Sequence, residues 1–228
     1  MDITLHYIEE GTGTPLLLLH GNGEDGTYFK HQLAYFSKKY RVIAVDTRGH
    51  GQSPRGAAPF TISQFAEDLN AFLEQRDISK AVILGFSDGA NIAMRFAMKH
   101  QEKVEALILN GGNLNARGVK ASVQIPIELG YRMTKLFSRI SEKARKNHEM
   151  LALMVDDPNI EPSELKEIHV PTLVIAGTED MIKEEHTKLL AAEIPGAELK
   201  FVKGGHFVAA KASEEFNAAV DLFLERVL

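Results

Sequence analysis

Ala81-Val82-Ile83-Leu84-Gly85-Phe86-Ser87-Asp88-Gly89-Ala90-Asn91 is the stretch that decides the fold. It begins with a continuous apolar run closed by a glycine, which is typical of a strand buried on both faces of a sheet. The residues after it predict an amphipathic helix, because apolar side chains recur at helical spacing at Ile92, Ala93, Phe96 and Ala97. A serine therefore lies at a sharp junction between a strand and a helix.

The junction has the spacing G-x-S-x-G, which exposes a serine on a tight strand-to-helix turn. Gly85 and Gly89 lie two residues before and two after Ser87, where side chains would clash with neighbouring backbone. The positive end of the helix dipole favours negative charge that develops beside the serine. Because ordinary turns also match so short a pattern, it predicts a nucleophile only together with suitable partners elsewhere in the chain.

Composition limits the classes of protein to which the chain can belong. Its 228 residues are enough for one domain with an inserted subdomain. A net charge of −5 and a pI near 6.0 argue against a nucleic acid or an anionic membrane as partner. The absence of cysteine excludes disulfides, thiolate metal sites and cysteine nucleophiles. No signal peptide is visible and no apolar run approaches the ~20 residues that span a bilayer, so we expect a cytoplasmic protein.

Strand and helix patterns alternate along most of the chain. Strands are predicted at residues 3–8, 16–19, 41–45, 81–86, 104–109, 171–177 and 198–202. Helices are predicted at about residues 27–38, 61–75, 90–100, 184–192 and 213–226. This alternation predicts an α/β fold with a doubly wound, mostly parallel sheet covered by helices on both faces. Glycine-rich polar loops follow the strands, and ligands of such sheets bind at the carboxyl ends of the strands.

Residues 113–168 interrupt the alternation, because no buried strand is recognisable in them. Pro126 is predicted to open a helix at its first turn. Apolar residues repeat at helical spacing after it, and we expect them to pack within this segment rather than to contact a substrate; they are Leu129, Met133, Leu136 and Phe137. The sequence therefore predicts a core formed by residues 1–112 and 169–228, with a helical insertion at residues 113–168.

Candidate partners for Ser87 follow two late strands. Ester hydrolysis needs a nucleophile, a base, a group that orients the base, and donors for the oxyanion. Asp180 and His206 follow predicted strands, so both loops lie at the carboxyl edge of the sheet, and Glu179 is the adjacent alternative acid. Imidazole suits the role of base because its unperturbed pKa, roughly 6.5, lies near neutral pH. The expected oxyanion donors are the backbone N–H groups of two residues, Asn22 and Asp88.

Four motifs together resemble the α/β-hydrolase-fold serine hydrolases. They are His20-Gly21-Asn22-Gly23, Asp46-x-Arg48-Gly49-x-Gly51-x-Ser53, Gly85-x-Ser87-x-Gly89, and Gly177-x-x-Asp180 with Gly205-His206. The order Ser, Asp, His along the chain agrees with this family. The resemblance implies an esterase-like triad with Asp180 rather than Glu179 as its acid. It also implies that the insertion forms a small cap over the site.

The remaining polar residues of these motifs have structural interpretations. His20 and His50 are expected to hold their own loops, and Asp46 and Arg48 to brace the loop beneath the serine turn. Asp88 has two interpretations: a carboxylate favoured by the helix dipole, or a side chain that faces the pocket and binds a cationic group of the substrate. Surface positions are expected for three further histidines, His148, His169 and His186.

We expect hydrolysis of a small carboxylic ester, or of an amide or thioester, through an acyl-enzyme on Ser87. A carbon–carbon bond hydrolase or lyase with the same triad stays open, as does a ligand-binding protein without turnover. No His or carboxylate residues fall at the spacing of a metal site, so no metal or cofactor is expected. The expected partner is a small ester-like molecule, without nucleic acid or membrane, and the chain is compatible with a monomer or a dimer.

Overall fold

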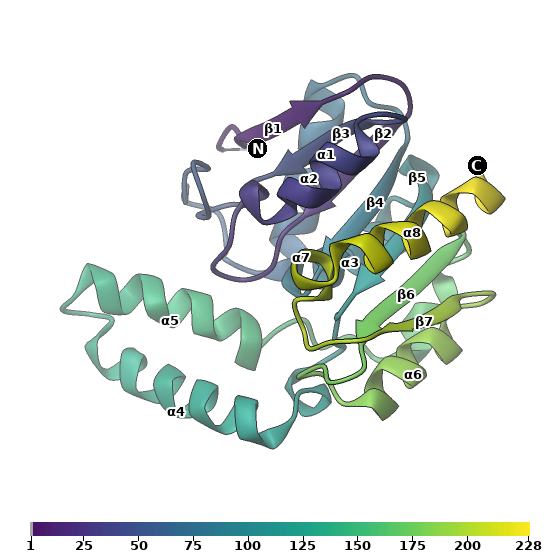
Figure 1. Ribbon diagram of the computed structural model, residues 1–228. Helices are drawn as coiled ribbons and strands as arrows, with labels where there is room; N and C mark the ends of the chain where they lie inside the picture. Colours follow the sequence, from purple (N-terminus) through teal and green to yellow (C-terminus); the bar gives the residue numbers. More distant parts are fainter. Residues whose placement is uncertain (1) are drawn as a thin grey trace.

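The computed structural model describes residues 2–228 and contains a seven-stranded sheet with the order β1-β3-β2-β4-β5-β6-β7 (Figure 1). β1 pairs antiparallel with β3, and the other neighbours pair parallel. The strands are β1 Tyr7–Glu10, β2 Pro15–Leu19, β3 Arg41–Val45, β4 Ala81–Phe86, β5 Val104–Asn110, β6 Thr172–Gly177 and β7 Glu198–Val202. The expected mostly parallel sheet is confirmed.

Helices cover both faces of the sheet. On one face lie α2 (Ile62–Gln75), α3 (Asp88–Lys99) and α6 (Glu184–Glu193). On the other, in front of the sheet in Figure 1, lie α1 (Lys30–Phe36), α7 (Val208–Lys211) and α8 (Ser213–Val227). The interior strand β2 divides its side chains between the two layers: Leu17 and Leu19 pack on the first and Leu16 and Leu18 on the second. Burial on both faces explains why this strand is a continuous apolar run.

The strand order reverses between β2 and β4. From β2 the chain moves outward to β3 and then crosses back to β4 on the other side of β2. The loops after β2 and β4 therefore lead to helices on opposite faces of the sheet, which is the position where ligands of open α/β sheets bind. These loops carry the His20-Gly21-Asn22-Gly23 motif and Ser87.

Local elements depart from the sequence-based expectations near the N-terminus. The edge strand begins at Tyr7 rather than at residue 3, because β1 pairs with β3 only from Tyr7, opposite Val45, to Glu10, opposite Val42. The helix expected at residues 27–38 is divided into the 3₁₀ helix η1 (Gly26–Phe29) and α1, which ends at Phe36. The four-residue helix α7 was not predicted, since so short an element has no measurable periodicity.

The insertion forms an antiparallel hairpin of α4 (Ala121–Phe137) and α5 (Glu142–Val155), which projects from the body of the molecule (Figure 1). The expectation that Pro126 opens the helix was wrong, because α4 begins five residues earlier. Proline lacks an N–H group and leaves the carbonyl of Ser122 without its helical partner. Ser122 is exposed, so water can satisfy that carbonyl. We call residues 121–155 the cap hairpin.

The base of the cap hairpin is anchored in the core. The Ile160 N–H donates a 2.8 Å hydrogen bond to the Leu114 carbonyl. His186, expected at the surface, is half-buried, and its Nε2 accepts the Leu114 N–H at 2.9 Å, so that expectation was wrong. The 3₁₀ helix η4 (Pro162–Glu167) follows the hairpin, and Leu165 packs in the core cluster beside α2 and α3. Only the middle of the expected insertion therefore stands away from the sheet.

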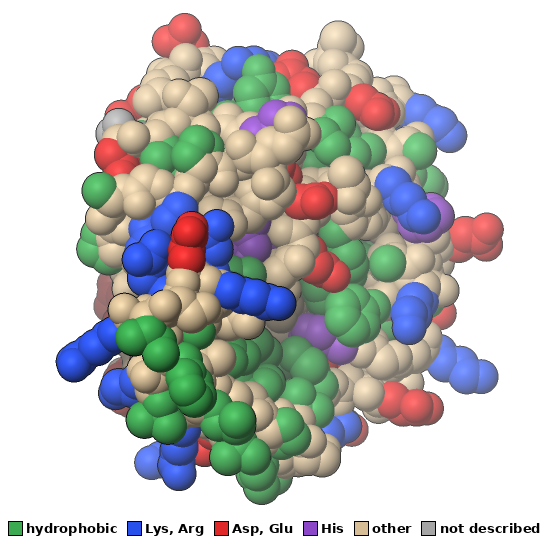
Figure 2. Space-filling model, turned by 90° about the vertical axis from the view of Figure 1, so that its left-hand side faces the viewer, with side chains coloured by type: hydrophobic (Ala, Val, Ile, Leu, Met, Phe, Trp, Pro, Cys, Tyr) green, Lys and Arg blue, Asp and Glu red, His purple; other side chains and the backbone are tan. Residues whose placement is uncertain are grey.

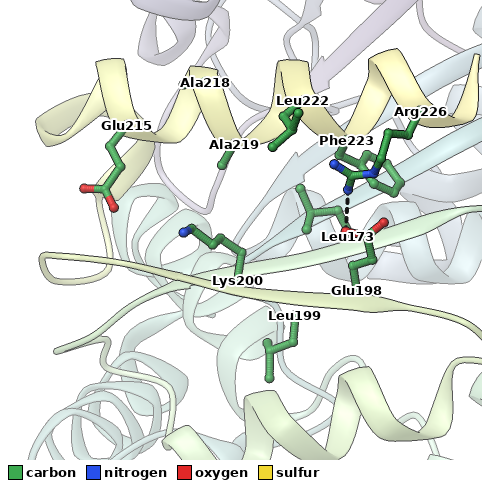
Figure 3. A pocket seen from close by; sticks show the side chains of 10 residues that line it. All are labelled: Leu173, Glu198, Leu199, Lys200, Glu215, Ala218, Ala219, Leu222, Phe223 and Arg226. Carbon is green, nitrogen blue, oxygen red and sulfur yellow. Dashed lines mark hydrogen bonds and ion pairs between the residues drawn. The ribbon is translucent and has the colours of Figure 1, made fainter.

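The far edge of the sheet carries charged side chains. β7 and α8 border a groove of about 330 Å³, and the side chains of Glu198 and Lys200 from β7 are part of its lining (Figure 3). Arg226 of α8 forms an ion pair with Glu198 across it. Charges on an edge strand oppose pairing with another chain. None of the helices found between residues 2 and 228 combines the length and the hydropathy that a membrane-spanning helix requires.

Candidate active site

The turn between β4 and α3 holds Ser87 in a sparsely populated conformation. Its backbone has φ 54° and ψ −118°, a left-handed region that favours glycine. A Cβ atom on Gly85 would collide with the backbone of Gly89. A Cβ atom on Gly89 would collide with the carbonyl of Leu19 at the end of β2. The crowding inferred from the sequence is therefore confirmed, and it holds the serine at the carboxyl edge of the sheet.

The three residues Ser87, His206 and Asp180 come together from three separate loops. Ser87 Oγ lies 3.0 Å from His206 Nε2, and His206 Nδ1 lies 2.7 Å from Asp180 Oδ1. A carboxylate can only accept, so Nδ1 donates to Asp180 and Nε2 is left to accept from the serine hydroxyl. Glu179, the alternative acid, is exposed, and the carboxylate hydrogen-bonded to His206 is that of Asp180. The arrangement can take a proton from Ser87 and hold it on the imidazole.

Asp180 is held in its ionised form. Burial acts to raise the pKa of this carboxyl group, but the hydrogen bond and charge of His206 outweigh burial and lower it below its ordinary value. The backbone N–H groups of Ile182 and Gly177 add hydrogen bonds of 2.9 and 3.3 Å. A fixed negative charge therefore faces Nδ1 and stabilises the imidazolium that forms when His206 takes a proton.

The imidazole of His206 fits a space left by a glycine. Gly111 has φ +61°, and a Cβ atom on it would lie 2.8 Å from His206 Cε1. The rings of Phe86 and Phe207 flank the imidazole, with centroids 4.8 and 5.5 Å away. Packing on several sides fixes the orientation of the base relative to the serine.

The loop after β2 passes next to the serine. A Cβ atom on Gly21 would lie 3.2 Å from Ser87 Cβ, so a side chain at this position would require its neighbours to shift. The Asn22 side chain donates a 2.7 Å hydrogen bond to the carbonyl of Met150 in α5. Asp88 is the first residue of α3, where a backbone N–H has no partner inside the helix. Both residues expected to supply oxyanion donors therefore border Ser87.

The Asp88 side chain is buried in a polar cluster. Its Oδ1 accepts from Asn91 Nδ2 at 3.4 Å, while its Oδ2 has no hydrogen-bond partner among residues 2–228. Burial is the main cause that raises the pKa of Asp88 to about 7; the charge of nearby Asp157 acts in the same direction, and the side-chain amides of Asn22 and Asn91 oppose the rise. Asn91 also donates to Asn113 Oδ1 at 3.1 Å. One buried carboxylate oxygen is thus free to accept a proton or a donor.

Two buried histidines have structural roles, as expected. His20 Nδ1 lies 2.8 Å from the Gly21 carbonyl, and its Nε2 accepts the Thr47 N–H at 3.0 Å. His50 contacts the Thr47 hydroxyl at 3.0 Å. Burial lowers the pKa of His20 and lowers that of His50 to about 4, so both rings stay neutral. They join the loops after β2 and β3 without facing the serine.

The Asp46 motif braces the same loops. Asp46 accepts the N–H groups of Gly26 at 2.7 Å and Gln52 at 2.9 Å. Arg48 is fully buried and forms an ion pair of 2.6 Å with Asp68 of α2. The structural role inferred from the sequence for these two residues is confirmed.

Sequence reasoning missed two polar residues beside the site. Tyr28 stacks on Phe86 with a centroid distance of 4.5 Å, and burial raises the pKa of its hydroxyl. Burial also raises the pKa of Glu24, which the backbone of Gly21 and the charge of His206 partly offset. Within the described chain, the Tyr28 hydroxyl and Glu24 Oε2 are buried without a hydrogen-bond partner. The only feature of the sequence that could have identified them is their position within or just after the glycine-rich loop that follows β2.

Across residues 2–228, no cluster of three or more His, Cys, Asp or Glu side chains is arranged to hold a metal ion. The site consists of a hydroxyl, an imidazole, a carboxylate and backbone donors. These groups are the components of acyl transfer through a covalent intermediate.

Comparison with known proteins places the chain in a family. Residues 14–128 match the family described as alpha/beta hydrolase fold, and the chain belongs to this family. The chain is 24% identical to 3-oxoadipate enol-lactonase 2 of Acinetobacter baylyi, over 99% of this chain and 94% of that one. It is 27% identical to the putative carbamate hydrolase RutD of Azorhizobium caulinodans, over 95% and 93% of the two chains.

A solved structure titled "Est816 as an N-Acyl homoserine lactone degrading enzyme" is also similar. It superposes with a TM-score of 0.80 at 27% identity and covers 97% of each chain. The names of these relatives refer to different substrates, namely an enol-lactone, a carbamate and an N-acyl homoserine lactone. What they have in common with this chain is membership of a hydrolase family.

Proposed function

We propose that this protein is a serine hydrolase that cleaves a small carboxylic ester through an acyl-enzyme on Ser87. One observation carries the proposal: the continuous hydrogen-bonded chain from Ser87 Oγ through His206 to Asp180, with distances of 3.0 and 2.7 Å. A structural serine needs no strained backbone and no imidazole oriented by a buried carboxylate. The combination supports an activated nucleophile.

The reaction then has two halves. Ser87 Oγ attacks the ester carbonyl while its proton moves to His206 Nε2, and the oxyanion is held by the backbone N–H groups of Asn22 and Asp88. The carbonyl re-forms, the carbon–oxygen bond to the alcohol breaks, and His206 returns the proton to the departing alcohol. Water repeats the sequence and releases the acid. Each oxyanion donor contributes about 3 kcal/mol of transition-state stabilisation.

Cyclic esters belong to the proposed substrate range. A lactone is an ester whose alcohol stays attached to its acyl group, so the same two steps open it. The enol-lactonase relative and the N-acyl homoserine lactone degrading enzyme carry lactones in their names, which supports the ester class. Amides and thioesters are the next candidate substrates, because their cleavage needs the same nucleophile and the same oxyanion donors.

The Asp88 side chain is proposed to bind a cationic group of the substrate, such as an amine. Its buried Oδ2 has no partner among the residues described, and a buried acceptor is costly to leave unpaired. A neighbouring cation would favour the ionised carboxylate and so lower its pKa from about 7. Substrate binding and ionisation of Asp88 would therefore be coupled.

The decisive experiment is the intact mass of the protein after exposure to a small fluorophosphonate. We expect one adduct on the native chain, none on Ser87→Ala, and one on the matched control Ser163→Ala, which removes an exposed serine. A labelled protein is then assayed with aryl esters, a γ-lactone and a β-diketone. Absence of labelling would overturn the proposal in favour of a binding protein. Labelling with β-diketone cleavage and no ester cleavage would replace it with carbon–carbon hydrolysis.

A further inference from the structure

Six apolar side chains on one side of the cap hairpin are exposed. Between 53% and 81% of their surface is accessible, and they are Ile125, Leu129, Met133, Leu136, Phe137 and Ile140. The expectation that the middle four pack within the insertion was wrong. Their spacing of three or four residues places them along one face of α4 and its C-terminal turn, over about 20 Å. We call these six residues the cap stripe.

Three residues of the cap stripe also line a groove at the tip of the hairpin. This groove has a volume of about 460 Å³ and lies between α4 and α5, with Met133, Phe137, Ile140 and Ala144 among its lining residues. Figure 2 shows hydrophobic side chains gathered on this part of the surface, with Lys and Arg side chains around them. A contiguous exposed apolar patch of this kind marks an interaction surface.

The charge around the cap stripe is opposite to that of the whole chain. Residues 129–147 contain six exposed cationic side chains, Arg132, Lys135, Arg139, Lys143, Arg145 and Lys146. Their only acidic neighbour in this segment is Glu142, which pairs with Lys146 at 3.3 Å. The segment therefore has a net charge of +5, and the whole cap hairpin, which also contains Glu128 and Glu149, has a net charge of +3 in a chain whose total is −5. An anionic surface would attract the cap and repel the rest of the molecule.

We propose that the cap stripe docks on the surface of an anionic lipid bilayer. An apolar helix face bordered by Lys and Arg is the arrangement of helices that lie in the membrane interface. Each basic side chain near such a surface adds to binding, and six are present. A second copy docking by the same face would bring two cap hairpins of net charge +3 together, which electrostatic repulsion opposes.

The sequence-based expectation of no membrane partner rested on the net charge of −5, and the charge of the cap gives a different answer. That expectation used the net charge of the entire chain, which averages a cationic cap with an anionic body. A bilayer interacts with the face that approaches it, and screening confines the interaction to about 10 Å at 0.1 M salt. The local charge of the cap therefore decides the outcome. The inference does not depend on the reaction catalysed at Ser87.

The test is co-sedimentation of the purified full-length protein with two kinds of vesicle. We expect binding to vesicles of phosphatidylcholine mixed with phosphatidylserine, little binding to phosphatidylcholine alone, and release at about 1 M salt, where screening is strong. Leu136→Asp and the double variant Arg139→Glu/Lys143→Glu should each weaken partitioning at least about tenfold. The matched controls Leu222→Asp and Lys38→Glu/Lys203→Glu change exposed residues outside the cap and should bind as the native protein does.

Three results would overturn the proposal. The first is a native protein that binds neither kind of vesicle, and the second is equal loss of binding in the cap variants and their controls. The third is a dimer in solution, measured by light scattering, that Leu136→Asp converts to a monomer while vesicles are not bound; this would assign the cap stripe to a second copy. Because Leu136 is 76% exposed, its replacement should leave thermal unfolding unchanged, which checks that the variant is folded.

Discussion

Asn22 Nδ2 donates a 2.7 Å hydrogen bond to the backbone carbonyl of Met150. The first residue lies in the loop beside Ser87, and the second lies in α5 of the cap hairpin. The loop proposed to hold the oxyanion is thereby attached to the cap. Cap position and the geometry of the oxyanion donors are expected to change together.

Asn22→Ala should lower kcat/KM for esters about five- to tenfold, although it keeps the backbone N–H group. The side-chain hydrogen bond contributes about 1 kcal/mol, and its loss frees the loop to move away from the serine. Steady-state kinetics measure the change. Asn70→Ala, which removes a surface amide bonded to Glu74, serves as the control and should have native activity. Native activity in Asn22→Ala would mean that the cap does not position the donor.

Asp180→Asn should lower kcat by about 10³- to 10⁴-fold, because the amide stabilises the wrong tautomer of His206 and not its imidazolium form. Glu179→Gln is a matched change one residue earlier, at an exposed side chain, and should lower kcat less than twofold. The two variants are compared on one ester under saturating conditions. Comparable losses would show that the acid has been assigned to the wrong residue.

Gly111→Ala and Gly196→Ala separate backbone strain from displacement of the catalytic base. Both glycines have positive φ, +61° and +73°, so each substitution should lower the free energy of unfolding by about 1 kcal/mol. Only the new methyl group at position 111 would meet His206, at 2.8 Å from Cε1, whereas nothing lies within 4 Å at position 196. Activity should therefore fall about 10²-fold in Gly111→Ala alone. Equal activities in the two variants would contradict this assignment.

Asp88→Asn should stabilise the fold, and more so at high pH. The folded-state pKa of Asp88 is raised to about 7, so the unfolded chain ionises first and native stability is lost as pH rises from the ordinary carboxyl range to about 7. Asparagine does not titrate. The gain in free energy of unfolding should thus be about 2 kcal/mol larger at pH 8 than at pH 5. Denaturant titrations at both values measure it, and a gain independent of pH would rule out a titrating Asp88.

Asp88→Asn also tests recognition of a cationic substrate. The methyl ester of β-alanine and methyl butyrate have similar shapes, but only the first carries an ammonium group. We expect the variant to lower kcat/KM about tenfold for the amino ester, through loss of a charge-assisted contact, and to leave methyl butyrate nearly unaffected. If both esters lose equally, the side chain acts on the turn at Ser87 and not on the substrate.

The sheet and the triad could be predicted because local patterns determine them. A strand buried on both faces must be apolar throughout, and the close approach of Gly85 and Gly89 leaves no alternative residue. Ser87 and Asp180 each follow such a strand, whereas His206 follows the charged edge strand β7, and parallel strands bring their carboxyl ends to one edge. Strand patterns therefore brought the three loops to one edge, while the choice of Asp180 over Glu179 came from the family resemblance.

The cap and the surroundings of the triad could not be predicted in the same way. The spacing of Leu129 and Phe137 identifies an apolar helix face but not whether another element covers it. The burial of Glu24 and Tyr28 depends on how a glycine-rich loop folds over Phe86, which no periodicity records. Charge presents the same difficulty, because a sum over the chain hides the difference between the cap and the body.

The hydrogen bond between Ile160 and Leu114 has a consequence for how this protein can diversify. The two points at which the chain leaves and re-enters the core are neighbours, so the segment between them is a cassette. Its length can change without moving either attachment point, and the closure entropy of a longer segment grows only slowly. Substitution, elongation or exchange of this cassette would give new substrate ranges while Ser87, Asp180 and His206, which lie outside it, keep their positions.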